Sequence, residues 1–187
     1  MLRTLLKFSG PIASSWALSW CLYRLRGICL IGRPHEEIWY FAYGANMHDS
    51  AFREWRGLRP TEWRPGRVRD TGCVSTSRDP PKGRTIYANL CADPAADVWG
   101  VLYKITRRDL VRLEATEGVP WWCYRPLWLD AEDMSRTSLH AATLTAEGDE
   151  DDYTPTLRYL TLLREGPRAH GLPDHYIRFL EQAEHGR

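Results

Sequence analysis

The sequence lacks the short motifs that identify most cofactor-dependent and metal-dependent enzymes. Its 187 residues contain no Gly-x-Gly-x-x-Gly, no phosphate-binding Walker loop, no Gly-x-Ser-x-Gly nucleophile turn and no His-Glu-x-x-His. The six histidines are spaced too irregularly for a local metal site. These absences predict a protein without a cofactor and without a bound metal, so any reaction must depend on its own side chains.

Cysteine pairs and a strongly basic face are also missing. The five cysteines are odd in number, widely spaced and include no Cys-x-x-Cys, which argues against a disulfide framework or a zinc site and predicts reduced, intracellular thiols. Five bases precede the first acid, Glu36, and leave 20 bases against 24 acids in the remainder. A mildly acidic body cannot displace counterions from phosphates, so we expect no nucleic-acid partner.

The N-terminal segment has no apolar run long enough for a membrane-spanning helix. Residues 8–23 are uncharged between basic flanks, but they are interrupted by Ser, Gly and Pro and are shorter than the roughly 20 apolar residues of such a helix. Arginines follow them where a signal peptide needs small residues. Three interpretations stay open: a helix packed on the body, peripheral membrane association through residues 1–33, or upstream sequence that is not normally translated. We expect a cytoplasmic protein, either free or membrane-associated.

Two parts are predicted: an appendage at 1–37 and one domain at 38–187. Strands are expected first, at 39–43, 72–75, 85–90, a central one at 98–105, and an antiparallel pair at 124–130 and 139–146. Residues 53–72, rich in Arg, Trp, Pro and Gly, are expected to be irregular with solvated arginines. This order predicts an α+β fold, a small, mostly antiparallel, barrel-like sheet with flanking helices.

Three helices are expected among these strands. Thr106-x-x-Asp109 predicts a capping box, and Gly118 ends the helix that it begins. A second helix is expected from Thr154-Pro155 to Gly166, with Leu157, Leu160 and Leu163 on one side. A third follows Gly171-Leu172-Pro173-Asp174, with Ile177, Leu180 and Ala183 facing inward, and the acidic run 147–152 is expected to be a solvated loop.

The segment Trp39-Tyr40-Phe41-Ala42-Tyr43-Gly44-Ala45-Asn46-Met47 joins an aromatic, buried strand to a loop. Gly44 removes a side chain where the chain turns or a ligand approaches its backbone, and Asn46 adds a short polar group. Successive N–H groups in such a turn hold anions. The segment therefore indicates a substrate loop, although a plain strand-ending turn has the same pattern.

Two glutamates are candidate general bases. Glu117 precedes Gly118 and is followed by Val119-Pro120-Trp121-Trp122, where aromatic walls would desolvate a carboxylate and raise its pKa. Glu114 is nearly as good a candidate for the general base, and both residues fit equally well as surface acids. Cys123 is a poor candidate nucleophile because a strand thiol in apolar surroundings keeps its proton.

In chain order, four segments resemble the gamma-glutamylcyclotransferase family. Residues 40–47 are similar to its opening Tyr-Gly-Ser-Asn loop, and Val98-Trp99-Gly100-Val101-Leu102-Tyr103 to its central strand. Leu113-Glu114-Ala115-Thr116-Glu117-Gly118-Val119 is similar to its catalytic Glu-Gly-Val segment, with Tyr124 at the family's spacing. Pro155-Thr156-Leu157-Arg158-Tyr159 and Gly171-Leu172-Pro173 are similar to its closing helical part. The resemblance spans about residues 38–182.

The resemblance implies a reaction that cyclises a small-molecule gamma-glutamyl substrate, an amide, to 5-oxoproline and releases the amine. It implies Glu117 as the catalytic acid and base and a substrate site made of Tyr43, Gly44, Ala45, Asn46, Tyr124 and Tyr159. It implies no cofactor and no metal, and leaves the oligomeric state unknown. Ala45 replaces the family's serine and puts the substrate specificity in doubt.

Two alternatives to this activity remain. One is a gamma-glutamylamine cyclotransferase for isopeptides or specialised metabolites, in whose relatives Leu tends to replace Asn46. The other is a non-catalytic binding protein on the same fold.

Overall fold

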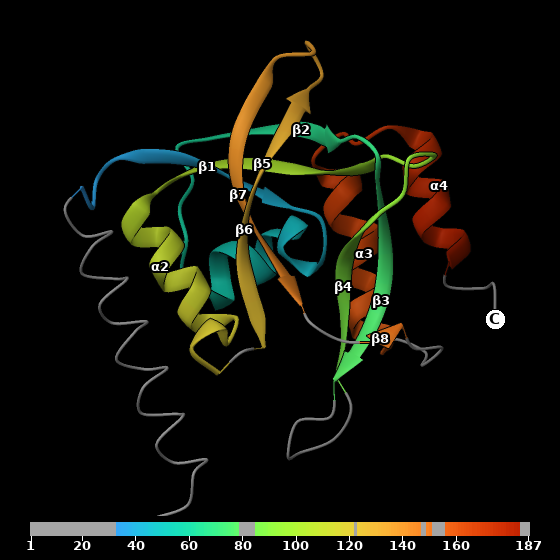
Figure 1. Ribbon diagram of the computed structural model, residues 1–187, viewed down its shortest axis with the longest axis horizontal. Coiled ribbons are helices and arrows are strands. Elements are labelled where there is room, and N and C mark those ends of the chain that lie inside the picture. Colours follow the sequence, from blue (N-terminus) through green and yellow to red (C-terminus); the bar gives the residue numbers. More distant parts are fainter. Residues whose placement is uncertain (1–32, 79–84, 122, 147–148, 151–155, 184–187) are drawn as a thin grey trace, which may run out of the picture.

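A five-stranded barrel forms the centre of the protein in the computed structural model, which describes residues 33–78, 85–121, 123–146, 149–150 and 156–183. The strands occur around the barrel in the order β1-β5-β2-β6-β7. The bounds are β1 (Glu37–Ala42), β2 (Glu62–Val68), β5 (Val98–Thr106), β6 (Tyr124–Asp133) and β7 (Ser138–Ala146). A parallel pairing of β1 with β7 closes the barrel, while the other pairings are antiparallel. The predicted α+β, barrel-like fold is confirmed (Figure 1).

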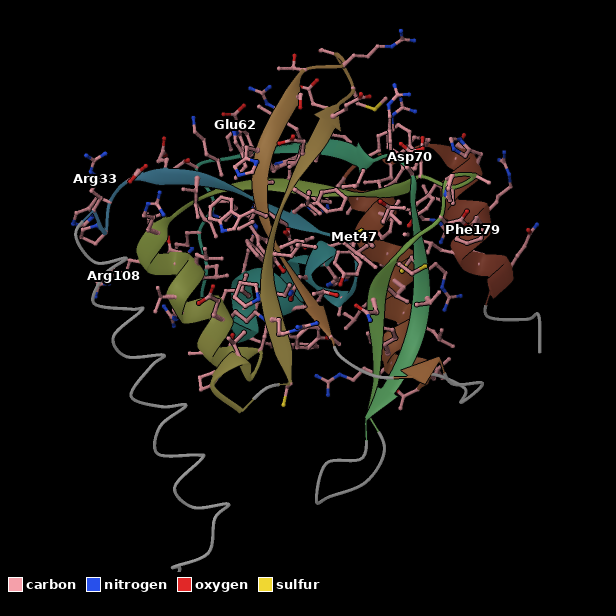
Figure 2. The ribbon with its side chains drawn as sticks, in the orientation of Figure 1. Arg33, Met47, Glu62, Asp70, Arg108 and Phe179 are labelled. Carbon is pink, nitrogen blue, oxygen red and sulfur yellow. The ribbon has the colours of Figure 1, made fainter. Side chains whose placement is uncertain are left out.

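Strands β1 and β5 contribute to both core clusters because both of their faces are buried. Side chains alternate across a strand, so β1 sends Tyr40 into one core cluster and Phe41 into another. Tyr40 stacks with Phe52, with ring centroids 5.9 Å apart, and Phe52 stacks with Tyr103 of β5 at 4.1 Å. The prediction that residues 98–105 form a central strand is confirmed, since β5 lies between β1 and β2. Figure 2 shows Met47 in the middle of the molecule beside these rings.

The expectation of irregular structure across residues 53–72 is wrong for β2. Pro65 and Gly66 lower its strand propensity, but β2 pairs with β5 along its whole length. On its other side it pairs with β6 only at Gly66 and Arg67, so the missing N–H of Pro65 has little consequence there. Tertiary pairing therefore overrides local composition at this strand.

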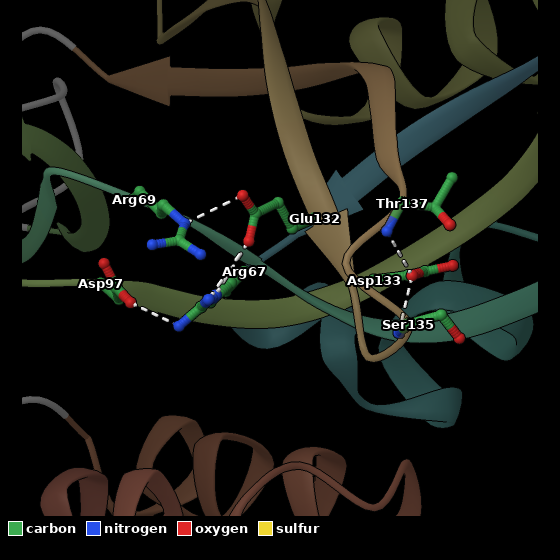
Figure 3. Close-up of polar contacts among 7 residues, drawn as sticks. All are labelled: Arg67, Arg69, Asp97, Glu132, Asp133, Ser135 and Thr137. Atoms are coloured by element: carbon green, nitrogen blue, oxygen red, sulfur yellow. Dashed lines mark hydrogen bonds and ion pairs between the residues drawn. The ribbon is translucent and has the colours of Figure 1, made fainter.

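The arginines of this segment are paired rather than merely solvated. Arg67 lies between Asp97 and Glu132, and Arg69 also bonds Glu132 (Figure 3). Beside them the carboxylate of Asp133 accepts hydrogen bonds from the backbone N–H groups of residues 135 and 137, which fixes the turn between β6 and β7. These pairs tie β2 to β6 across the barrel surface.

A second sheet lies beside the barrel. It has the order β4-β3-β8, with bounds β3 (Thr71–Arg78), β4 (Thr85–Ala92) and β8 (Asp149–Glu150). The predicted strands at 72–75 and 85–90 are confirmed. The acidic run 147–152 was expected to be a loop, but its residues 149–150 pair with β3, while 147–148 and 151–152 lie outside the described residues.

Helix α2 (Arg107–Thr116) lies on one side of the barrel, and α3 (Leu157–Ala169) and α4 (Asp174–Ala183) lie on the other (Figure 1). The capping box that begins α2 is confirmed: Thr106 Oγ1 accepts from Asp109 N at 3.1 Å, and Asp109 Oδ2 accepts from Thr106 N at 3.3 Å. Helix α2 then buries Leu110, Leu113 and Glu114.

Both predicted ends of the second helix are wrong. Thr156 caps α3, while Thr154 and Pro155 lie outside the described residues. The helix continues through Gly166 and Pro167 to Ala169. Gly166 is there for close packing, since an added Cβ would lie 2.8 Å from backbone atoms of Met47 and His48.

The predicted inward faces of α3 and α4 are right in part. Leu162 is buried in α3, while the expected Leu157 is exposed. In α4, Ile177 is buried and Leu180 packs against the core, as expected, while the side chain of Ala183 lies outside the described part.

The predicted appendage lies almost wholly outside the described residues, because the structure describes the chain from residue 33 onward. The division at residue 37 stays a prediction. Among the described helices, none has the length and apolar character needed to cross a membrane.

Candidate active site

The loop after β1 is held in a single short turn. Strand β1 ends at Ala42, and Ala45–Met47 form a 3-10 turn, η1, in which Met47 N donates to Gly44 O at 3.0 Å. The first N–H groups of such a turn have no partner inside it, so they are available to a ligand. Gly44 has a φ of −121°, so the turn itself does not require glycine. An added Cβ would lie among the cavity residues, 3.4 Å from Ala88 Cβ, and this leaves ligand access as the reason for Gly44.

Two tyrosine hydroxyls meet at Ala88 of β4, one from this loop and one from α3. The hydroxyl of Tyr43 donates to Leu144 O at 2.6 Å and to Ala88 O at 3.3 Å. The hydroxyl of Tyr159, from α3, accepts from Ala88 N at 3.2 Å. Both hydroxyls are therefore engaged in holding β4 and β7 around the loop.

Glu117 follows the last residue of α2. Its N–H donates to Leu113 O at 2.9 Å, and Gly118 then turns the chain with a φ of 76°, in the left-handed region that favours glycine. A Cβ at Gly118 would lie 3.0 Å from Cys123. The Glu-Gly pair therefore ends the helix and points the glutamate towards the loop after β1.

One carboxylate oxygen of Glu117 is held by two side chains. Oε1 accepts from Asn46 Nδ2 at 2.7 Å and from Arg56 Nε at 2.9 Å, with Arg56 Nη2 at 2.5 Å. Asn46 Nδ2 also donates to Tyr40 Oη at 3.3 Å, and Arg56 Nη1 donates to Ala51 O at 3.0 Å. Every contact falls on Oε1, so within the described part of the chain Oε2 has no hydrogen-bond partner.

The hydroxyls around this carboxylate stay protonated. Burial raises the pKa of Tyr40, Tyr43 and Tyr159 well above the ordinary value, and the nearby Glu117 charge adds to the effect. An arginine does not lose its proton in a protein. Among the side chains that line this cavity, Glu117 is the one carboxylate, the kind of group that can serve as a general acid and base.

A cavity of about 210 Å³ lies between these groups. The structure brings all seven residues predicted for the site to its wall: Tyr43, Gly44, Ala45, Asn46, Glu117, Tyr124 and Tyr159. Four further residues line it: Tyr40, Arg56, Ala88 and Leu144. Glu114 does not line it and is fully buried in the packing face of α2, so it is not a surface acid.

Arg56 is the functional candidate that the sequence analysis missed. It lies after the π-helical turn η2 (Ser50–Trp55), in the segment expected to be irregular and solvated. Glu117 was expected between tryptophan walls, but the described contacts of its carboxylate are with a guanidinium and an amide. Nothing in the sequence separates Arg56 from the other arginines nearby, since its partner is 61 residues away.

Residues that could hold a metal are not gathered at this site. Within the described ranges, no group of three or more His, Cys, Asp or Glu side chains is arranged for an ion. His48 contacts Ser50 and Glu165, and His170 contacts Tyr103 and Gly166. The charged side chains that line the cavity are one carboxylate, Glu117, and one guanidinium, Arg56.

The barrel, the loop after β1 and the Glu-Gly pair after α2 together define a class of α+β proteins. A model of the AIG2-like family matches residues 97–180, which include Glu117, Tyr124 and Tyr159. The resemblance to the gamma-glutamylcyclotransferase family is confirmed, and the protein has that family's fold.

Particular relatives carry the same name. A gamma-glutamylcyclotransferase of Bos taurus is 24% identical over 155 residues, which are 80% of this chain and 80% of the relative. A solved gamma-glutamyl cyclotransferase superposes with a TM-score of 0.67 at 20% identity, covering 78% of this chain and 87% of the other. A yeast cyclotransferase described as specific to glutathione gives 0.60 at 12% identity, covering 80% and 96%. Family and fold support a gamma-glutamylcyclotransferase-like activity.

Proposed function

We propose that this protein is a gamma-glutamylcyclotransferase, which converts a gamma-glutamyl amide into 5-oxoproline and releases the free amine or amino acid. The observation that carries the proposal is the arrangement of Glu117. Arg56 and Asn46 hold its Oε1, and Oε2 is left for a substrate at the wall of a small cavity. Such a carboxylate is oriented before the substrate arrives, which is what a proton-transfer group requires.

The reaction needs no nucleophile from the protein. The α-amino nitrogen of the substrate attacks the γ-carbonyl carbon and closes a five-membered ring, so the geometry of binding supplies much of the rate. Glu117 takes a proton from the α-ammonium group, which frees the attacking electron pair. As the ring closes, the same nitrogen gives up a second proton. The carbon–nitrogen bond to the leaving amine then breaks, and Glu117 passes both protons in turn to the leaving nitrogen, which departs as an ammonium group. The ammonium group of the substrate is replaced by that of the released amine, so no net proton is consumed.

Backbone N–H groups of the loop from Tyr43 to Asn46 hold the negative charge of the substrate. They face either its α-carboxylate or the oxygen that becomes negative during ring closure. Ala45 lacks the hydroxyl of the family's serine, but its backbone donor is unchanged. The loop therefore keeps the groups that act on charge.

The size of the cavity favours a small acyl group. Its volume of about 210 Å³ is below the roughly 300–1,000 Å³ of pockets that enclose whole drug-sized ligands. We infer that it encloses the gamma-glutamyl part, while the leaving amine extends towards the surface. The same cavity would serve an amino acid or a simple amine as the leaving group.

The test is an assay of 5-oxoproline release from several gamma-glutamyl amides with the wild type, Glu117→Gln and Glu114→Gln. Loss of general acid and base catalysis lowers kcat by about 10²–10⁴-fold, so Glu117→Gln should retain almost no turnover. It should still bind 5-oxoproline in isothermal titration, because the amide keeps the shape of the side chain. Glu114→Gln should keep its turnover, with circular dichroism verifying that this buried position still folds.

Three results would contradict the proposal. A wild type that releases no 5-oxoproline from any amide, but binds it, would instead indicate the non-catalytic binding protein. Full turnover by Glu117→Gln would remove the glutamate from the mechanism. Loss of turnover by a folded Glu114→Gln with an active Glu117→Gln would exchange the two roles.

A further inference from the structure

Trp55 of η2 and Arg158 of α3 form an exposed pair of side chains. The guanidinium carbon of Arg158 is 4.4 Å from the centroid of the Trp55 ring. Each residue is the chain neighbour of a cavity residue, since Trp55 precedes Arg56 and Arg158 precedes Tyr159. Neighbouring Cα atoms are about 3.8 Å apart, so each member of the pair lies next to a residue of the cavity wall. The pair connects η2 to α3 at the protein surface.

Arg158 supplies the positive charge of this pair. Among the described residues no carboxylate pairs with it, whereas Arg56 pairs with Glu117 and Arg53 pairs with Asp49. Its guanidinium carbon lies over an aromatic ring, and a guanidinium that contacts a ring in this way can still donate through its N–H groups. A carboxylate meets such an edge with two parallel hydrogen bonds.

Trp55 adds an apolar surface beside this cation. Its side chain is 49% exposed, although tryptophan is among the side chains that gain most from burial. The contact with Arg158 covers one part of the indole and leaves the rest uncovered. A free cation next to a free apolar face matches the chemistry of an amino acid, which has a carboxylate beside an apolar side chain.

We propose that Trp55 and Arg158 form the site that selects the leaving group, and that they favour an α-amino acid joined through its α-nitrogen. This inference rests on the proposed cyclotransferase function, in which the leaving group extends out of the cavity. Arg158 binds the carboxylate next to the scissile nitrogen, and the indole covers the side chain of the leaving amino acid. An amine without that carboxylate, including a lysine joined through its ε-nitrogen, lacks the contact with Arg158 at the same position.

The experiment compares two substrates that differ only in the carboxylate, gamma-glutamyl-alanine and gamma-glutamyl-ethylamide. The wild type should prefer the alanine compound. Arg158→Gln should lower kcat/KM for it about tenfold, which corresponds to about 1.4 kcal/mol, and should leave the ethylamide within about twofold. The loss should fall on KM rather than kcat, because the contact is the same in the bound substrate and in the transition state.

Two further variants make the result specific. Arg158→Lys should recover part of the loss, since an ammonium keeps the charge but not the two-bond geometry. Arg178→Gln removes an equally exposed arginine from α4 and should change neither substrate. Thermal melts identify any variant whose fold has changed.

The outcomes separate this inference from the proposed function. Equal losses on both substrates, no loss on either, or a wild type that treats both alike would overturn the leaving-group site while leaving the cyclotransferase intact. A wild type that turns over neither compound, nor any other gamma-glutamyl amide, would overturn both proposals.

Discussion

Replacing Arg56 by methionine removes the cation beside Glu117 and keeps most of the apolar stem. Breaking a buried ion pair costs about 3–5 kcal/mol, whereas an exposed pair contributes about 0.2–1 kcal/mol. The side chains of Arg56 and Glu117 are 16% and 12% exposed, which places this pair closer to the buried case. We therefore expect Arg56→Met to lower the free energy of unfolding by about 2–3 kcal/mol, since only Asn46 still bonds the carboxylate.

Urea denaturation of a double-mutant cycle measures the coupling between the two groups. When Arg56→Met is added to Glu117→Gln, neither charge of the pair remains, so no buried carboxylate is left without a partner. The added substitution should therefore cost about 1 kcal/mol, close to one ordinary hydrogen bond. Arg53→Met is the matched control on the same turn. Its pair with Asp49 is 35% and 57% exposed, and its loss should cost less than about 1 kcal/mol.

The same variant should also lose activity. Without Arg56 the carboxylate is free to rotate about its remaining bond, and a displacement of about 1 Å in a catalytic group can cost about 100-fold in rate. An equal cost of Arg56→Met in both backgrounds, or a stable Arg56→Met with the turnover of the wild type, would refute the view that this pair orients Glu117.

Further predictions concern the loop, a surface turn and the N-terminal segment. Gly44→Ala should fold normally but raise KM about tenfold or more, because its methyl group enters the cavity. Ala45→Ser should alter the preference among amides by at most about tenfold, the value of one neutral hydrogen bond, and a uniform gain of about 100-fold would instead make the hydroxyl part of the catalytic machinery. The N–H of Thr137 holds the pKa of Asp133 below its usual range, so this stabilisation is present above about pH 4 and lost as the pH falls below it; urea unfolding at pH 5 and pH 3 should show a larger loss in the wild type than in Asp133→Asn. Residues 38–187 should fold and react alone, and equal flotation of this fragment and the full chain with anionic vesicles would exclude an interfacial helix.

The elements that local rules could predict are those whose signals lie within a few residues. The capping box at Thr106 and the glycine at 118 fix both ends of α2, because capping contacts join residues three or four apart. The sequence of β5 is apolar on both faces, which predicts a central strand, and β5 lies between β1 and β2. Local signals did not separate Glu117 from Glu114, and it was the resemblance to the family that put Glu117 first.

The elements that local rules missed depend on contacts between distant residues. Strand β2 contains proline and glycine and forms only because β5 offers a full-length partner. Arg56 belongs to the site because Glu117 lies 61 residues further along the chain. Helix α3 passes Gly166 because the missing side chain lets the helix pack on the backbone of Met47, a reason that a helix-ending rule does not contain.

Residues that do not line the cavity hold the backbone of the loop after β1 in place. The hydroxyl of Tyr103 donates to Met47 O at 3.2 Å and contacts His170 Nε2 at 3.1 Å, while Gly166 packs against the same carbonyl. These contacts come from β5 and α3, two rigid elements, so the N–H groups of η1 keep their direction when the cavity is empty. Donors that are already oriented need no reorganisation as charge develops, and they act in the same way whatever side chain residue 45 has. In the proposed reaction the oxyanion contacts come from the backbone of this loop and the proton transfer from Glu117, so the choice of the leaving amine is left to the residues at the edge of the cavity.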